Sequence, residues 1–136
     1  MKYLLDTNVL SDFVRGHPEV LARLRATPNT LLGISALTEL EVEYGLAKNP
    51  ALRANVADAM RALLDAITVL PFEREDARVA AHLRATLNAQ GEPIGAYDLL
   101  IAASALRRGL IVITANPREF SRVGGLAVEN WRAGEA

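Results

Sequence analysis

The sequence contains no cysteine and only two histidines, His17 and His82. The absence of cysteine excludes disulfides, thiol nucleophiles and thiolate metal sites, and it is typical of a protein from a reducing compartment. The two histidines occupy a Gly-His-Pro turn and a surface-like helical segment, and their spacing suits neither a metal site nor an acid-base pair. Chemistry in this chain is therefore expected to depend on oxygen-bearing side chains.

Long hydrophobic runs are also absent. No apolar stretch reaches the roughly 18 residues of a membrane-spanning helix. The N-terminus passes from Lys2 through residues 3–5 directly to Asp6, without the apolar segment of a signal peptide. We expect a cytoplasmic protein that does not bind a membrane.

A strong excess of positive charge is missing as well. The formal net charge is −1, so the molecule as a whole has no field that would attract nucleic acid. Lysine occurs only at positions 2 and 48, and the remaining positive side chains are arginines, which suit bidentate contact with phosphate or carboxylate. Each arginine could equally be an ordinary exposed helix residue, so any contact with nucleic acid is expected to be local.

What the sequence does contain is the pattern of an α/β protein. Its 136 residues, 51% hydrophobic and 23% charged, fit one globular domain over residues 1–136. Short apolar runs at residues 3–5, 31–34, 67–70 and 110–114 alternate with longer segments of helical periodicity. This alternation predicts a central parallel sheet covered by helices, with a further short strand at residues 127–128.

Three of the intervening segments have informative helical patterns. The segments that begin at residues 51 and 73 each carry one apolar face, which predicts helices that cover the sheet. The segment 98–106 is apolar on nearly every side, which predicts a central buried helix. Trp131 is expected to pack the C-terminal segment down. The two apolar faces consist of Leu52, Val56, Met60, Leu63 and Ile67, and of Val79, Leu83 and Leu87.

Two aspartates are notable for their positions. Asp6 directly follows the first predicted strand, and ligands of open α/β sheets bind beyond the carboxyl ends of the strands. Asp98 opens the most apolar helix, after the glycine-flanked loop GEPIGAYD. Either residue could instead serve only as a helix cap or as a partner of the helix dipole.

One of three glutamates in the segment SALTELEVEYGLA is separated from the others by helix geometry. At about 100° per residue, Leu37, Leu40 and Tyr44 form the predicted apolar stripe, and Glu41 lies beside it. The other two glutamates point away from the stripe. Glu41 is therefore the acid predicted to point inward, and the alternative is a boundary residue that reaches water.

A further polar group, formed by Thr114, Asn116, Arg118 and Glu119, follows the strand predicted at residues 110–114. If the strands are parallel and adjacent, all these polar groups meet at one edge of the sheet. Crowded carboxylates raise one another's pKa unless a cation neutralises them, and clusters of Asp and Glu suit Mg²⁺ or Mn²⁺. The sequence thus predicts metal-assisted phosphodiester chemistry, in which one ion activates a water and a second stabilises the leaving oxygen.

Three stretches of the chain resemble, in order and spacing, the PIN-domain ribonucleases of the VapC toxin type. They are LLDTNVLSD, ISALTELEVEYG and PIGAYDLLIAASALRRGLIVITANPREFSRVGGLAVENW. The resemblance implies a small three-layer α/β/α sandwich with a central parallel sheet. It also implies three acids that hold Mg²⁺ or Mn²⁺, and these fall here on Asp6, Glu41 and Asp98.

The resemblance implies roles for neighbouring residues too. The family often has a fourth acid after the last core strand, where this chain has an asparagine, so Glu119 is the candidate for the missing carboxylate. The remaining polar neighbours would orient the acids and a water molecule. They are Thr7, Asn8, Thr114 and Asn116.

For function, the resemblance implies the toxin of a toxin–antitoxin pair. Such a toxin is an endoribonuclease that cuts structured RNA, commonly transfer RNA, and forms a homodimer. A cognate VapB-like antitoxin silences it, often by inserting an arginine or another side chain toward the acids. The arginines that could contact RNA phosphate are Arg15, Arg23, Arg25, Arg107, Arg108, Arg118 and Arg122.

Two other functions stay open at this point. A Mg²⁺-dependent phosphatase or phosphoacceptor domain also has an aspartate after its first strand, but here that strand lacks a paired Asp-x-Asp and no lysine follows the later strands. A non-catalytic PIN-like module that only binds a partner protein or RNA is also left open by the asparagine at position 116.

Overall fold

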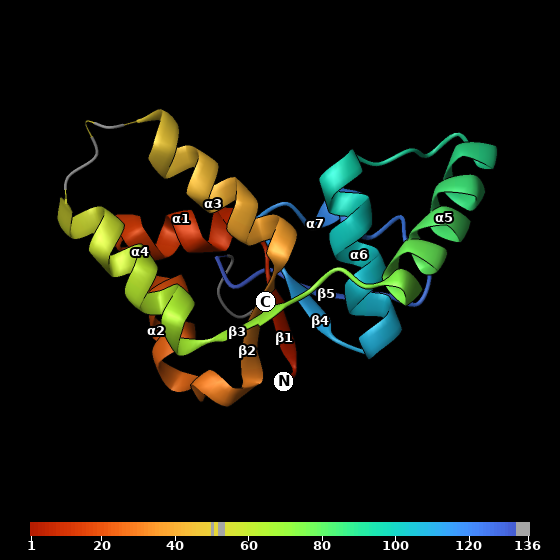
Figure 1. Ribbon diagram of the computed structural model, residues 1–136. Coiled ribbons are helices and arrows are strands. Elements are labelled where there is room, and N and C mark those ends of the chain that lie inside the picture. Colours follow the sequence, from red (N-terminus) through yellow and green to blue (C-terminus); the bar gives the residue numbers. More distant parts are fainter. Residues whose placement is uncertain (50, 52–53, 133–136) are drawn as a thin grey trace.

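The computed structural model describes residues 1–49, 51 and 54–132. Five parallel strands form one sheet in the order β3-β2-β1-β4-β5 (Figure 1). The strands predicted from the apolar runs are all confirmed. They are β1 (Tyr3–Leu5), β2 (Leu32–Ser35), β3 (Thr68–Leu70), β4 (Ile111–Ile113) and β5 (Ala127–Glu129). Because the strands are parallel, their carboxyl ends meet at a single edge of the sheet, with β1 in the middle.

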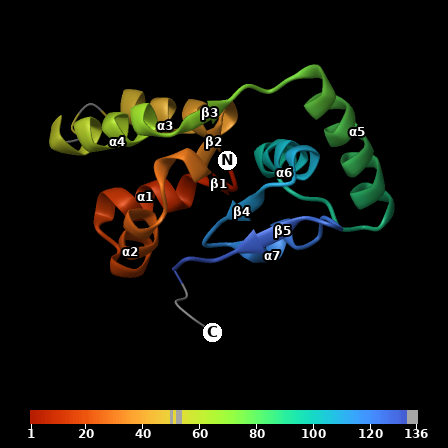
Figure 2. The same cartoon turned by 90° about the horizontal axis from the view of Figure 1, so that it is seen from below.

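Helices cover both faces of this sheet. One side carries α1 to α4, and the other carries α5 and α6 (Figure 2). Within the described part of the chain, no helix is both long and apolar enough to cross a bilayer. The helices are α1 (Thr7–Arg15), α2 (Pro18–Ala26), the 3₁₀ helix η1 (Asn29–Leu31), α3 (Ala36–Lys48), α4 (Ala54–Ala66), α5 (Arg74–Ala89), α6 (Ala96–Arg108) and α7 (Pro117–Phe120).

The strands separate two hydrophobic cores because successive side chains point to opposite faces of a sheet. Leu5 and Ile113 belong to the core under α1 to α4. Their neighbours Leu4 and Val112 belong to the core under α5 and α6, to which Phe120 of α7 also contributes. The predicted three-layer α/β/α sandwich with a central parallel sheet is thereby confirmed.

The predicted covering helices correspond to α4 and α5. In α4 the buried residues are Met60 and Leu64, so the buried face is turned slightly from the predicted one, and Leu52 lies outside the described residues. The segment 98–106 forms most of α6, which is the predicted central helix, since its residues from Ile101 to Ala105 are almost fully buried. Trp131 is 2% exposed and packs edge-on against Tyr3, with 5.2 Å between ring centroids.

The predicted apolar stripe on α3 is wrong. Leu40 is 50% exposed and Tyr44 is 62% exposed, whereas Thr38 and Val42 are buried. The helix contacts α1, β2, β3 and α6, so packing, and not the largest apolar side chains, decides which face turns inward. Glu41 adjoins the face that is buried. The prediction that Glu41 points inward is therefore correct, although the apolar stripe on which it was based is wrong.

Candidate active site

Side chains from four segments that are distant in sequence line one open pocket of about 340 Å³ at the carboxyl edge of the sheet. Asp6 follows β1, and Asn116 follows β4. Glu41 lies on α3, the helix that comes after β2 in the sequence, and Asp98 lies in the first turn of α6. The other lining residues are Thr7, Asn8, Ser11 and Phe120. The candidate residues chosen from the sequence are thus brought together, with Glu119 beside them in an adjoining cavity.

Asp6 is both the N-cap of α1 and a wall of the pocket. Its side chain is only 7% exposed, and its Oδ1 accepts a hydrogen bond from the Thr7 backbone N–H at 2.8 Å. Burial raises the pKa of Asp6, and hydrogen bonds from Thr114 and Thr7 counteract part of this rise. The capping role that the sequence left as an alternative is therefore real, and it fixes the carboxylate in the pocket.

A hydrogen-bond network ties the start of α1 to the loop after β4. The Thr114 hydroxyl donates to Asp6 Oδ2 at 2.9 Å, and the Asn8 amide donates to the same oxygen at 3.3 Å. Asn8 Oδ1 in turn accepts from the Ala115 backbone N–H at 3.0 Å, and Thr114 Oγ1 accepts from the Asn116 N–H at 3.1 Å. Thr114 is fully buried, so this network holds Asp6 in one orientation.

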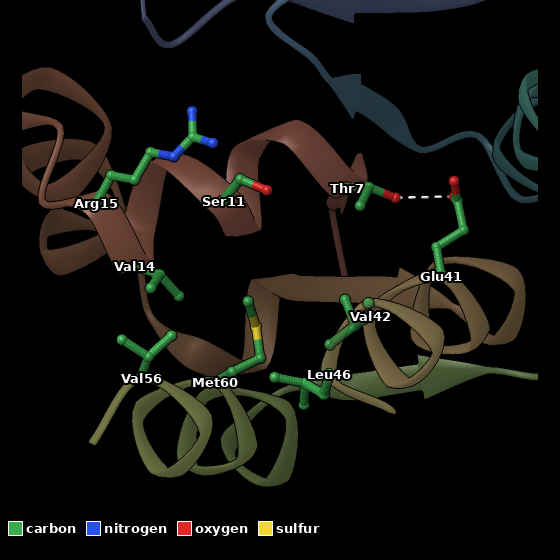
Figure 3. Close-up of a pocket in the computed structure, with 10 residues that line it drawn as sticks. Thr7, Ser11, Val14, Arg15, Glu41, Val42, Leu46, Val56 and Met60 are labelled. Atoms are coloured by element: carbon green, nitrogen blue, oxygen red, sulfur yellow. Dashed lines mark hydrogen bonds between the residues drawn. The ribbon is translucent and has the colours of Figure 1, made fainter. Parts of the chain in front are cut away.

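Glu41 is held from the side of α1. The Thr7 hydroxyl donates to Glu41 Oε1 at 2.9 Å, and Figure 3 shows this hydrogen bond as a dashed line between two residues that line a second cavity. The Thr7 backbone N–H binds Asp6 while its hydroxyl binds Glu41. One residue thereby sets the relative position of two of the acids.

Asp98 and Glu119 are close enough to influence each other's ionisation. The pKa of Asp98 is raised to about 7 by burial, by a hydrogen bond with the Glu119 carboxyl, and by the negative charges of Asp6, Glu119 and Glu41. Glu119 also accepts a hydrogen bond from the Gly95 backbone N–H, just before α6. Asp98 is therefore partly protonated near neutral pH, and the proton offsets part of the negative charge of the neighbouring carboxylates.

The arrangement fits a hydrated divalent ion. Within residues 1–49, 51 and 54–132, no three His, Asp or Glu side chains are close enough to form a complete metal site. Magnesium does not require one, because it keeps several waters and binds through one or two carboxylates plus substrate phosphate. Asp6, Glu41 and Asp98 around an open pocket provide this kind of donor set.

Two residues of the pocket wall, Ser11 and Phe120, were missed by the sequence analysis. Ser11 follows Thr7 by four positions in α1, so both side chains lie on one face of the helix. That spacing was a usable signal once Thr7 had been singled out. Phe120 gave no such signal, because a buried aromatic residue in a short helix is ordinary core.

Comparisons with known proteins show the family of the chain. The family model described as "PIN domain" matches residues 3–126. The chain is 35% identical over 131 residues to the tRNA(fMet)-specific endonuclease VapC of Shigella flexneri, covering 96% of this chain and 98% of that protein. It is 35% identical over 132 residues to ribonuclease VapC2 of Haemophilus influenzae, with the same coverage.

Solved structures give the same result. The crystal structure of DNA-bound VapBC from Salmonella typhimurium superposes with a TM-score of 0.87 at 32% identity, covering 96% of this chain and 98% of that one. VapBC2 from Rickettsia felis, bound to a DNA fragment from its promoter, gives 0.85 at 29% identity, covering 96% and 99%. The family model, the sequence relatives and the fold together identify the chain as a PIN-domain protein that belongs to the VapC ribonuclease toxins of VapBC toxin–antitoxin systems.

Proposed function

We propose that this protein is a Mg²⁺- or Mn²⁺-dependent endoribonuclease that cleaves transfer RNA in the cytoplasm. The observation that carries the proposal is the convergence of Asp6, Glu41 and Asp98 on one open pocket, where burial and the neighbouring carboxylates raise the pKa of Asp98 to about 7. The crowding of negative charge that contributes to this raised pKa also favours a divalent cation, which must compete with the proton for the carboxylates.

Each side chain has a distinct part in this proposal. Asp6, Glu41 and Asp98 bind the ion directly or through its waters, and Glu119 contributes the fourth carboxylate from α7. Thr7, Asn8 and Thr114 fix the directions of Asp6 and Glu41 through the hydrogen bonds described above. When bound, the ion lowers the pKa of an attacking water and stabilises negative charge on the phosphate.

The choice of substrate rests on the relatives. Proteins of Shigella flexneri and Salmonella typhimurium at about 35% identity over nearly the full chain are named tRNA(fMet)-specific endonucleases. Initiator transfer RNA is therefore the proposed substrate to be tried first.

Two macromolecular partners complete the proposal. A VapB-like antitoxin is proposed as the inhibitor, since relatives were crystallised as VapBC complexes. A second copy of the chain is also proposed, and the exposure of Leu40, Tyr44 and Tyr97, three large hydrophobic side chains, supports it. Sedimentation of Leu40→Glu beside wild type tests the homodimer, because a buried charge at that interface would give a monomer.

Cleavage of initiator transfer RNA tests the enzyme. We expect cleavage by wild type with Mg²⁺ or Mn²⁺, none in EDTA, and none by Asp6→Asn, which keeps the shape of the side chain but not its charge. Arg25→Gln, on α2, is the matched control and should cleave like wild type. Cleavage that survives both EDTA and Asp6→Asn would contradict the mechanism. A calorimetric titration without metal binding would favour a non-catalytic binding module.

A further inference from the structure

The structure divides the arginines that could contact RNA into two groups. Arg23 is paired with Glu129 at 3.3 Å, and Arg107 and Arg108 contact Asp76 at 2.8 and 2.7 Å. These guanidiniums already neutralise carboxylates of the protein. In the described part of the chain, no carboxylate lies within ion-pair distance of the other four, which are Arg15, Arg25, Arg118 and Arg122.

Two of these four lie beside the acids, next to β4. Arg118 and Arg122 line a cavity of about 460 Å³ together with Glu119 and Asn116, and Asn116 also lines the acidic pocket. Arg118 lies in α7, and Arg122 lies in the turn that follows this short helix. Arg122 donates to the Pro93 carbonyl at 2.7 Å, which orients its guanidinium without neutralising it.

Arg15 lies on the opposite side of the acids. Thr7, Ser11 and Arg15 recur every four residues along α1, and all three line a cavity of about 300 Å³ between α1, α3 and α4. This cavity shares Thr7, Ser11 and Glu41 with the acidic pocket. Figure 3 shows the Ser11 hydroxyl and the Arg15 guanidinium above the aliphatic side chains of the cavity. Eight residues of helix place Arg15 about 12 Å from Thr7 along α1.

Three cavities thus form a continuous series, with carboxylates in the middle and unneutralised guanidiniums at both ends. A polyanion approaching the acids is repelled by them, and the net charge of −1 offers no compensating field. Guanidiniums on both sides can overcome this repulsion, and their planar donors suit phosphate oxygens. The open cavities suit an unpaired strand, whose backbone can follow a groove.

We propose that a single-stranded segment of RNA crosses the site from Arg118 and Arg122 on one side to Arg15 on the other, with its phosphates bound by these three guanidiniums. The inference rests on the proposed ribonuclease function and specifies how the substrate lies. The scissile phosphate is positioned over the acids because the phosphates on either side of it are held.

Equilibrium binding tests this path. The probe is a fluorescein-labelled initiator transfer RNA, its affinity for the full-length protein is measured by anisotropy in EDTA, and the titration is repeated over a series of KCl concentrations. We expect Arg15→Gln, Arg118→Gln and Arg122→Gln each to weaken binding about fivefold. Each should also reduce the slope of log affinity against log salt by about 0.7 to 1.

Two controls separate a path from general charge. Arg25 is exposed near the end of α2, and the following η1 leads to the amino end of β2, so it lies at the opposite edge of the sheet. Arg25→Gln should leave both affinity and slope unchanged. Arg118→Lys should keep the slope while losing part of the affinity, because lysine keeps the charge without the bidentate geometry.

The possible results distinguish this inference from the proposed function. The three path variants are Arg15→Gln, Arg118→Gln and Arg122→Gln. If Arg25→Gln lost as much RNA affinity as these variants, the proposed path would be wrong. Wild-type binding by the path variants would also overturn it, even if the protein cleaves RNA in a metal-dependent manner. Selective losses in the three variants would support the path even if no cleavage were found, and only the proposed function would then fail.

Discussion

At the residue scale, Asp98 shows how strongly neighbours determine the state of one side chain. Its position in the first turn of α6 favours the ionised form through the helix dipole. Burial, the hydrogen bond with Glu119 and the charges of Asp6, Glu119 and Glu41 nevertheless raise its pKa to about 7. The sequence located the residue, but the direction of this shift depends on side chains that only folding brings near it.

The raised pKa predicts that the metal-free protein loses stability as the pH rises from about 4 to about 7. In the unfolded chain Asp98 ionises near its ordinary value of 3.8, whereas the native state holds the proton to about 7, so the native state binds more protons in this window. The raised pKa of Asp6 acts in the same direction. Urea unfolding in EDTA at a series of pH values measures the effect.

In the same experiment Asp98→Asn should flatten the pH dependence, and added Mg²⁺ should bind more tightly at the alkaline end because it competes with the proton. An unchanged slope in Asp98→Asn would show that other groups are responsible.

Thr114 offers a second prediction at this scale. Thr114→Val removes the hydroxyl that donates to Asp6 and accepts from the Asn116 N–H, while the volume of the side chain is kept. We expect a loss of about 1–3 kcal/mol in unfolding free energy and a fall of about 10- to 100-fold in metal affinity. Denaturation measures the unfolding free energy, and calorimetry measures the metal affinity. Thr114→Ser keeps the hydroxyl and should restore most of both, and equal effects of valine and serine would contradict the proposed role.

At the scale of elements, α3 combines a correct and an incorrect prediction. Its helical nature follows from its sequence, and Glu41 was chosen correctly as its inward acid. The face predicted to be buried is wrong, because Leu40 and Tyr44 are exposed while Thr38 is buried. Periodicity identifies a helix with an apolar side, but in α3 apolar residues occur around much of the circumference and only the neighbouring elements select a face.

Gly45 within α3 gives a prediction for this element. Glycine in a helix interior costs roughly 0.5–1 kcal/mol relative to alanine. A Cβ built on Gly45 would meet no atom within 4 Å, since the residue borders the cavity that also contains Arg15. We therefore expect Gly45→Ala to stabilise the protein by about that amount in thermal or urea unfolding.

The matched control is Gly109, the C-cap of α6. A Cβ would also meet no atom within 4 Å there, but φ is +66°, a conformation that alanine rarely adopts. Gly109→Ala should destabilise the protein by about 1 kcal/mol. Destabilisation by both substitutions would mean that α3 does not tolerate a side chain at position 45.

At the scale of the whole molecule, an ion-pair cluster joins the outer helix α5 to the central helix α6. Asp76 is completely buried and accepts hydrogen bonds from Arg107 and Arg108, which also contact Glu73. Burial alone would raise the pKa of Asp76, but the hydrogen bonds from Arg107, the Glu73 N–H and Arg108 lower it. The cluster therefore secures the helix that carries Asp98 at its other end.

Removing the charge of Asp76 should weaken the whole molecule. We expect Asp76→Asn to lower the unfolding free energy by about 2 kcal/mol, because two guanidiniums lose a buried partner. The control is Glu75→Gln, which removes the exposed Glu75–Arg78 pair at 2.6 Å and should change stability by less than about 0.5 kcal/mol. Similar effects of the two substitutions in urea unfolding would show that the Asp76 cluster contributes no more than a surface pair.

The sequence by itself determined the strands, the layers and the acids at the strand ends. These features depend on local hydrophobic patterns and on the rule that parallel strands share one carboxyl edge. Only the tertiary structure decided which face of α3 is buried, that Asp98 is hydrogen-bonded to Glu119, that Ser11 and Phe120 complete the pocket, and which arginines beside the acids have no ion-pair partner in the described part of the chain. The physical reason is that each of these properties depends on which segments, far apart in the chain, come into contact. The hydrogen bonds from Thr114 to Asp6 and from Arg107 to Asp76 are contacts of the same kind. Such contacts are set by packing and not by periodicity.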